Sequence, residues 1–195
     1  MQLHLFDFDG TISKNDSLFL FLKFVSSGFR YYGSLLVYAP LFGLALAGLM
    51  SKSEVKRKLI SFHLYGLNKE LLSELSHRFY EKILKKNLRK KAIQKIKELQ
   101  ENQYELYVVS ASLEIWLKPF CEDFNMKLIC TKAKYENNIF IGIFDGANCN
   151  RAEKQLRILK EIDLKKFSKV IAYGDSSGDR EMFELANLTF YKPFR

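Results

Sequence analysis

The chain has 195 residues, of which 48% are hydrophobic, and this composition supports a buried core with a small second domain while arguing against a disordered chain. The net charge of +9 favours anionic partners, either phosphorylated substrates or an anionic membrane surface. Three cysteines without metal-ligand spacing indicate buried thiols in a reducing compartment, and three scattered histidines form no cluster.

The first predicted element is a buried strand, indicated by an apolar run that begins at Leu3. The strand leads into Asp7-Phe8-Asp9-Gly10-Thr11, where Gly10 lets the backbone turn so that both carboxylates approach one reacting centre. The alternative is that the two aspartates only cap a turn. Because the N-terminus is itself a strand and has no basic region, we expect no secretory signal and a cytoplasmic protein.

A long insert follows, and residues 17–86 are predicted to form helices. Within it, residues 31–51 carry no charge, and this stretch is long enough to suggest a membrane span. A single crossing would separate Asp7 from the later polar motifs, and Pro40 is expected to divide the stretch into two short halves. Three interpretations stay open: a buried or dimerising helix pair, a surface that docks on lipid, and a true or re-entrant span.

Basic residues on both sides of this stretch fit either an anionic membrane surface or a solvated helix face. The aromatic side chains follow helical spacing and do not alternate with lysines on a strand. We therefore expect no nucleic-acid partner.

The rest of the chain alternates between predicted helices and strands. The first is a helix with apolar positions Leu88, Ala92, Ile96 and Leu99, followed by a strand ending at Val109 and a helix around Trp116. A hairpin then pairs residues 127–135 with 139–144 across Glu136-Asn137-Asn138. After it come a helix that carries Lys154, a strand ending at Tyr173, a helix at 182–186 and a strand at 188–191.

Polar residues follow two of these strands, as they follow the first one. Ser110-Ala111-Ser112 comes after one strand, and Gly174 to Asp179 comes after another. In an open parallel α/β sheet, ligands bind outside the carboxyl ends of the strands, so these segments and Lys154 are predicted to meet in one crevice. Taken singly, the serines could be helix N-caps and the 174–179 segment an ordinary loop.

The chain resembles the haloacid dehalogenase superfamily of phosphotransferases, which has four motifs. The matching segments here are, in order, Asp-x-Asp-Gly-Thr, Ser, Lys and Gly-Asp-Ser-x-x-Asp. The resemblance is greatest to the branch that includes phosphoserine phosphatase and phosphatidylglycerophosphatase-like proteins. It implies an α/β fold in which a Rossmann-like parallel sheet carries an inserted α-helical cap. The implied domains are a catalytic core of residues 1–14 and 88–195 and a cap of residues 15–87.

The resemblance also implies a role for each motif residue, and these roles match what phosphoryl transfer requires. Asp7 is the expected nucleophile, Asp9 the acid and base, and Ser110 and Lys154 the phosphoryl-binding groups. The expected Mg²⁺ ligands are Asp7, the carbonyl of Asp9 and Asp175. Asp179 is expected to help hold the metal or to orient Lys154. The expected substrate contacts are Thr11, Asp16 and Ser112.

The sequence departs from the family pattern at three places. Asp16 stands where phosphoserine phosphatases look to a glutamate, Ser110-Ala111-Ser112 replaces Ser-Gly-Gly, and Arg151 replaces a glycine that often precedes the lysine. The expected function is a Mg²⁺-dependent phosphomonoesterase that acts through an aspartyl-phosphate on a small-molecule or lipid phosphate. Phosphoserine phosphatase is one alternative, and an inactive membrane-associating or protein-binding module is another. Peripheral association with the inner membrane face and a homodimer stay open.

Overall fold

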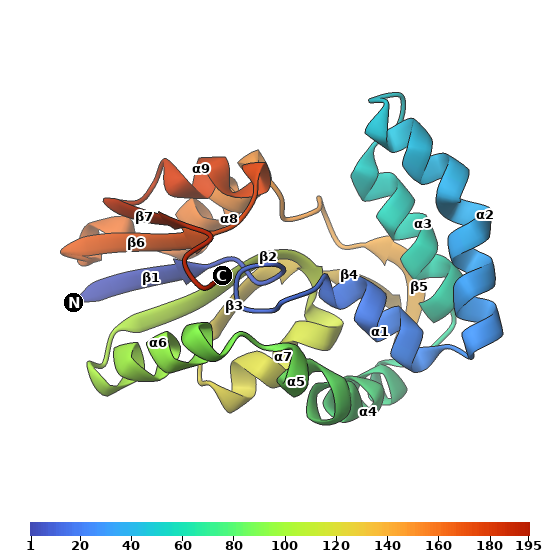
Figure 1. Cartoon of the computed structure of the whole chain (residues 1–195), viewed down its shortest axis with the longest axis horizontal. Helices are drawn as coiled ribbons and strands as arrows, with labels where there is room; N and C mark the ends of the chain where they lie inside the picture. Colours follow the sequence, from blue (N-terminus) through green and yellow to red (C-terminus); the bar gives the residue numbers. More distant parts are fainter.

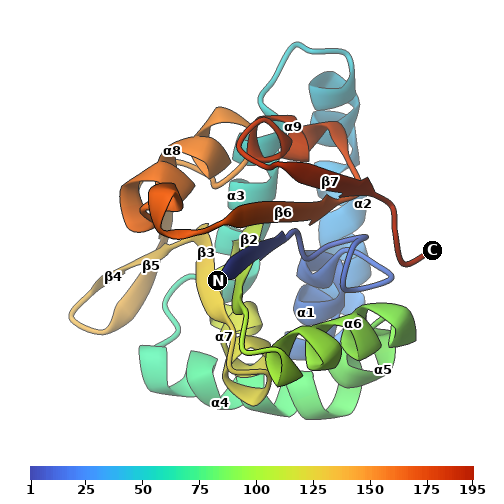
Figure 2. The same cartoon turned by 90° about the vertical axis from the view of Figure 1, so that its left-hand side faces the viewer.

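The computed structural model describes residues 1–195 and is built on a five-stranded parallel sheet. The strand order is β3-β2-β1-β6-β7, with every neighbouring pair parallel (Figure 2). The strands are β1 (Gln2–Phe6), β2 (Glu105–Leu113), β3 (Lys127–Thr131), β6 (Lys169–Gly174) and β7 (Leu188–Tyr191). The order of the strands confirms the predicted α/β fold with a Rossmann-like parallel sheet.

Helices cover both faces of this sheet, as Figure 2 shows. One face carries α6 (Lys90–Glu101) and α7 (Glu114–Asp123), and the other carries α8 (Ala152–Glu161) and α9 (Arg180–Phe183). The apolar face predicted for the first of these helices is buried as expected at Ala92, Ile96 and Leu99. Burial of such a stripe against the strands is what holds the layers together.

The insert between β1 and α6 consists of helices joined by short connections (Figure 1). It contains α1 (Ser17–Val25), α2 (Gly28–Leu46), α3 (Lys52–Leu64), α4 (Lys69–Phe79), a π-helical turn (Tyr80–Leu84) and α5 (Lys85–Asn87). Its two connections to the sheet are hydrogen-bonded to each other, because Lys14 N donates to Asn87 O at 2.9 Å and Arg89 N donates to Ile12 O at 2.8 Å. One apolar cluster runs through both the insert and one face of the sheet, and the cap boundary at 15–87 stays a prediction.

The prediction that Pro40 divides the apolar stretch is wrong, because α2 continues through it as one helix of 19 residues. Proline removes one helical hydrogen bond, to the carbonyl four residues earlier. Both Pro40 and Leu36 are exposed, so water can satisfy that carbonyl and the helix is not interrupted. None of the helices is both long and apolar enough to span a bilayer.

The predicted hairpin is correct at its turn and wrong at its first strand. β4 (Ala133–Glu136) and β5 (Ile139–Phe144) form the hairpin, and Asn137 and Asn138 have the positive φ values of 48° and 64° expected there. Residues 127–131 instead form β3 of the main sheet, where Ile129 and Cys130 are buried. A strand with consecutive buried apolar residues is favoured in a parallel sheet that is covered on both faces.

Candidate active site

The first motif lies at the carboxyl end of β1, where Asp7 N donates to Tyr173 O of β6 at 2.8 Å. Gly10 follows with a φ of +80°, a conformation that favours glycine. A Cβ at this position would also clash with Asp175 Oδ2, so the backbone after Asp9 passes directly against that carboxylate. The motif at 174–179 and the motif at 7–11 are therefore parts of one site.

Lys154 joins the same site from α8, with only 1% of its surface exposed. Its Nζ lies 2.7 Å from Asp7 Oδ1 and 2.5 Å from Asp179 Oδ1. Burial by itself lowers the pKa of a lysine, but the charges of Asp7 and Asp179 outweigh it and raise the pKa of Lys154 above its usual value. Burial likewise raises the pKa of Asp7, to about 7, although the charge of Lys154 opposes that rise. The result is a buried cation held between two carboxyl groups.

Arg151, at the N-terminal end of α8, takes the place of the glycine expected there. It adopts φ 53° and ψ −127°, a backbone conformation that L-residues rarely occupy. With that conformation, α8 begins at Ala152 and Lys154 N donates to Arg151 O at 2.9 Å. The substitution therefore leaves Lys154 in contact with both aspartates, at the expense of local backbone strain.

Asp9 has a different environment from Asp7, although only one residue separates them. Its Oδ1 accepts a hydrogen bond from Ser17 N at 2.7 Å, and its Oδ2 accepts one from Ser112 Oγ at 2.5 Å. Burial, together with the charge of Asp16, raises the pKa of Asp9 to about 6, while the hydrogen bonds from Ser112 and Ser17 oppose the rise. A carboxyl group with such a pKa can hold and release a proton near neutral pH.

The other predicted site residues divide into two groups. Thr11 and Ser112 bond to the aspartates, since Thr11 Oγ1 donates to Asp7 Oδ2 at 3.4 Å and Ser112 bonds to Asp9 as described. Ser110 lies at the same end of the sheet, but its Oγ accepts from Ser112 N at 3.1 Å and bonds to neither aspartate. Asp16 is bonded within the insert, where it caps α1 through Leu18 N at 3.0 Å.

The sequence pattern of the haloacid dehalogenase-like hydrolase family matches residues 4–184, which include all of these side chains. The chain belongs to this family. The resemblance stated from the motifs is thereby confirmed, and the protein is a hydrolase by family.

The chain is also similar to known proteins in sequence and in fold. The chain is 28% identical to the protein CicA of Caulobacter vibrioides over 192 residues, which span 97% of this chain and 85% of CicA. A crystal structure of a protein of unknown function from Bordetella pertussis Tohama I superposes with a TM-score of 0.83 at 18% identity, covering 97% of this chain and 89% of that one. A phosphoserine phosphatase solved as a phospho-aspartyl intermediate analogue superposes with a TM-score of 0.69 at 21% sequence identity, covering 97% of this chain and 85% of that one. At these identities, the two structures show that the fold is shared.

The carboxylates of this haloacid dehalogenase-like hydrolase fit a divalent cation. One carboxylate oxygen from each of Asp7, Asp175 and Asp179 lies within 4.8 Å of the others. Hard oxygen donors of this kind are what Mg²⁺ prefers. Asp179 also organises the loop, because its Oδ2 accepts from the backbone nitrogens of Asp175 and Ser176, each at 3.1 Å. The Asp9 carboxylate is turned toward Ser17 and Ser112, so only its backbone is available on the cluster side.

Three residues of the site were not predicted from the sequence. Trp116 Nε1 donates to Ser17 Oγ at 2.9 Å, and Ser17 Oγ lies 3.2 Å from Ser112 Oγ, so this chain of polar groups ends at Asp9.

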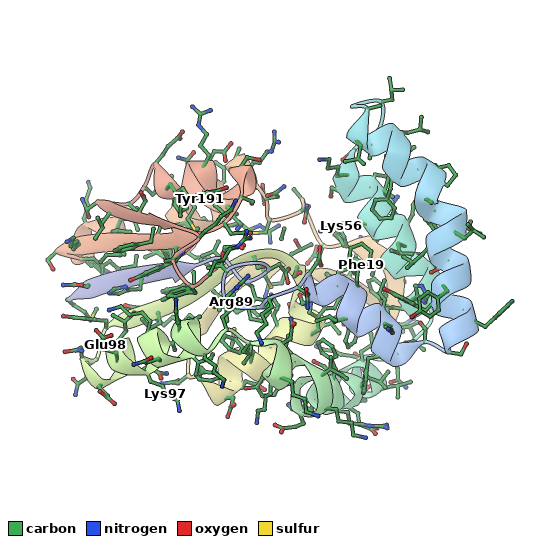
Figure 3. All side chains as sticks on the ribbon, in the orientation of Figure 1. Phe19, Lys56, Arg89, Lys97, Glu98 and Tyr191 are labelled. Carbon is green, nitrogen blue, oxygen red and sulfur yellow. The ribbon has the colours of Figure 1, made fainter.

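Lys56 of α3 lies 3.2 Å from Asp16 and faces the sheet (Figure 3). Burial lowers its pKa, but Asp16 and then Asp9 outweigh that effect and raise it. The position of Ser17 directly after an N-cap aspartate was a sequence signal that it lies near the first motif. Nothing in the sequence of a basic helix distinguishes Lys56 from a lysine exposed to solvent.

The space beside these residues is small. A cavity of about 10 Å³ lies next to Ser112 and Lys56, between Leu18, Ile60 and Trp116. That volume is close to the minimum that holds one water molecule. A phosphate ester does not fit in a cavity of this size.

Proposed function

We propose that the chain is a Mg²⁺-dependent phosphomonoesterase that acts through an aspartyl-phosphate on a small-molecule or lipid phosphate. The observation that carries the proposal is the contrast between the two aspartates. Asp7 is paired with the buried cation of Lys154, as a nucleophile that must be ionised requires. Asp9 makes no contact with that cation and accepts hydrogen bonds from Ser17 N and Ser112 Oγ instead. Burial raises its pKa to about 6, which permits proton transfer near neutral pH, so the contrast between the two aspartates is one of contacts.

In the first half of the reaction, an oxygen of Asp7 forms a bond to phosphorus while the bond from phosphorus to the leaving oxygen breaks. Asp9 gives its proton to that leaving oxygen, so the alcohol departs neutral. The ammonium of Lys154 lies 2.7 Å from Asp7 and offsets the negative charge that gathers around the transferred group. Ser110, Ser112 and Thr11 are proposed to hydrogen-bond the phosphoryl oxygens.

In the second half, the ionised Asp9 takes a proton from a water molecule whose oxygen bonds to phosphorus. The bond between phosphorus and Asp7 breaks, which releases inorganic phosphate and restores the Asp7 carboxylate. Asp7, Asp175 and Asp179, with the backbone carbonyl of Asp9, would hold Mg²⁺, which offsets phosphoryl charge when bound. The atoms balance as hydrolysis of a phosphate ester.

Phosphoserine is the specific alternative substrate, since a phosphoserine phosphatase shares the fold. The family's glutamate is replaced here by Asp16, whose Oδ2 is already 3.2 Å from Lys56 Nζ. A substrate amine would have to displace Lys56 from this pair. We therefore propose a phosphate monoester as the substrate class without naming one compound. The proposed location of the protein is the cytoplasm or the inner membrane face.

The test is hydrolysis of a panel of esters that includes an aryl phosphate, phosphoserine and a phosphatidylglycerol phosphate, with Mg²⁺ or with a chelator. We expect metal-dependent turnover, and Asp7→Asn should lower kcat by roughly 10³-fold or more because it removes the nucleophile. Circular dichroism of both proteins controls for folding. Folded wild-type protein that turns over none of the esters would contradict the proposal and favour a binding module without activity.

A further inference from the structure

Helix α2 turns an apolar face toward solvent. Figure 1 places it at the outer edge of the molecule, on the side of the insert away from the sheet. Phe29 is 94% exposed, Leu36 78%, Val37 72% and Leu46 76%. We call this surface the α2 face, made of Phe29, Tyr32, Leu36, Val37, Leu44, Leu46 and, in the following turn, Leu49. Exposed apolar side chains scattered singly are ordinary, but several of them spread over the outer half of one helix mark an interaction surface.

The rotation of α2 about its axis is fixed by contacts on its other side. Ser34 is buried there, and its Oγ lies 2.8 Å from His63 Nε2 of α3. Tyr38 OH donates to the carbonyl of Lys58, also on α3, at 3.4 Å. Because these polar contacts hold the inner side, α2 cannot roll its exposed apolar residues into the core without losing them.

The border of the α2 face is basic. No aspartate or glutamate occurs between Asp16 and Glu54, whereas Lys23, Arg30 and Lys52 lie in that interval and are all exposed. Lys23 Nζ lies 5.6 Å from the centre of the Tyr32 ring, so this charge adjoins the face itself. Lys52 begins α3, three residues after Leu49. An apolar surface with positive charges at its edge complements an anionic bilayer.

We propose that the α2 face docks the protein on the surface of an anionic lipid bilayer, with α2 lying in the plane of the interface. At 1.5 Å per residue, 19 residues form a helix roughly 28 Å long. Because the inner side of α2 is held against α3, only its outer side can contact lipid, and the helix lies along the surface. Pairing with a second copy through this face is less favourable, since a two-fold axis would bring the same basic border of each copy together.

Vesicle co-sedimentation tests the proposal without relying on catalysis. The wild type is mixed with phosphatidylcholine vesicles that contain phosphatidylglycerol, and separately with pure phosphatidylcholine vesicles, at low and high salt. We expect binding to the anionic vesicles that weakens with salt. The double variant Leu36→Glu/Leu46→Glu should bind about tenfold or more weakly, since it places two negative charges on the α2 face.

The matched control is Leu156→Glu/Leu159→Glu, which places the same charges at two exposed leucines of α8. This variant should bind vesicles like the wild type, and all three proteins should hydrolyse a soluble aryl phosphate equally. Absence of wild-type binding, or equal loss in both variants, would overturn the proposal. Sedimentation velocity resolves the remaining case: a wild-type dimer that becomes a monomer only in Leu36→Glu/Leu46→Glu, without vesicle binding, would replace lipid by a second copy of the chain.

Discussion

Asp7 and Asp9 show how the surroundings of a side chain, and not its type, determine its chemistry. Both are carboxylates of the same loop, but only Asp7 contacts the buried ammonium of Lys154. Asp9 accepts its hydrogen bonds from a backbone amide and a hydroxyl, which are neutral donors. The ion pair with Lys154 suits Asp7 to the proposed role of nucleophile. Asp9 lacks that partner and has a pKa of about 6, which suits the proposed role of acid and base.

The replacement Asp9→Asn should separate the two halves of the reaction. An aryl leaving group needs no proton, so formation of the phosphorylated Asp7 should continue, while its hydrolysis should slow by roughly 10²- to 10⁴-fold. We expect a burst of aryl alcohol close to one per enzyme, followed by a slow phase. Acid-quenched protein should carry phosphate that hydroxylamine releases.

The control for this experiment is Asp145→Asn, at an exposed aspartate beside β5. It should show wild-type turnover and no burst. If Asp9→Asn instead abolished the burst together with turnover, Asp9 would be needed before Asp7 is phosphorylated, and the assignment of its two roles would be wrong.

Arg151 provides a second prediction, on stability. Replacement by glycine should raise the free energy of unfolding by about 1 kcal/mol, because glycine adopts φ 53° and ψ −127° without the clash of a Cβ. Urea unfolding measures the change, and kcat should be unaffected since Lys154 keeps its contacts. Arg151→Ala is the matched control, because it removes the same side chain but keeps the strain. Equal stability of the two variants would contradict the argument.

At this scale, the motifs predicted which residues meet, because three of them follow strands of a parallel sheet and the fourth opens a helix beside it. Asp7, Lys154, Asp175 and Asp179 lie together as the crevice rule requires. The sequence could not predict which oxygen each donor contacts, and therefore not that Asp16 bonds within the insert. Lys56 was missed for the same reason, since its partner is 40 residues away in the chain.

Among the elements, the first three helices of the insert are joined by His63. Its Nδ1 lies 2.6 Å from Ser26 Oγ at the end of α1, and its Nε2 lies 2.8 Å from Ser34 Oγ of α2. Ser34 already donates its own proton to Tyr31 O at 2.7 Å. His63 Nε2 therefore donates its proton to Ser34. In the neutral ring that the lowered pKa of His63 favours, Nδ1 accepts a hydrogen bond from Ser26.

This arrangement predicts acid sensitivity of the helical insert. Burial, followed by the charge of Arg30, lowers the pKa of His63 from 6.5 to about 4. Between these values the unfolded chain binds a proton that the folded chain does not, so stability falls as the pH drops below about 6.5 and continues to fall toward about 4. At pH 5 this one group should account for about 2 kcal/mol.

Urea unfolding at pH 7 and pH 5 tests the effect in the wild type and in His63→Gln. The variant should be less stable at pH 7, because a hydrogen bond is lost, but its stability should change by about 2 kcal/mol less between the two pH values. His4 is also buried, with a pKa lowered to about 4, but it is present in both proteins. Its contribution to the pH dependence of stability therefore cancels in the comparison. An identical pH dependence in the two proteins would show that His63 is not the responsible group.

The two wrong predictions at this scale have tertiary causes. The run from Lys127 to Tyr135 has strand propensity throughout, and only its pairing with β2 shows that it divides into β3 and β4. Pro40 normally ends a helix, but its exposed position on α2 makes the missing hydrogen bond inexpensive. Local patterns therefore predicted the kind of each element more reliably than its partner or its end.

Across the whole molecule, the insert and the sheet share one apolar cluster. The link is aromatic: the Phe21 ring of α1 lies 5.2 Å from Phe79 of α4 and 5.1 Å from Trp116 of α7, measured between ring centres. Trp116 is the single tryptophan of the chain, and its Nε1 bonds to Ser17 of the insert. Its fluorescence therefore reports on the junction between the insert and the sheet.

A shared core predicts that the insert and the sheet unfold together. Urea titrations followed by Trp116 fluorescence and by far-ultraviolet circular dichroism should give one coincident transition. Phe79→Ala should lower the free energy of unfolding by about 3–5 kcal/mol and shift both signals equally, because it opens a cavity in the common cluster. If Trp116 fluorescence changed at lower urea while most helical signal remained, the insert would be an independently unfolding unit. Opening of the site would then need only the local separation of this junction and not the disruption of a common core.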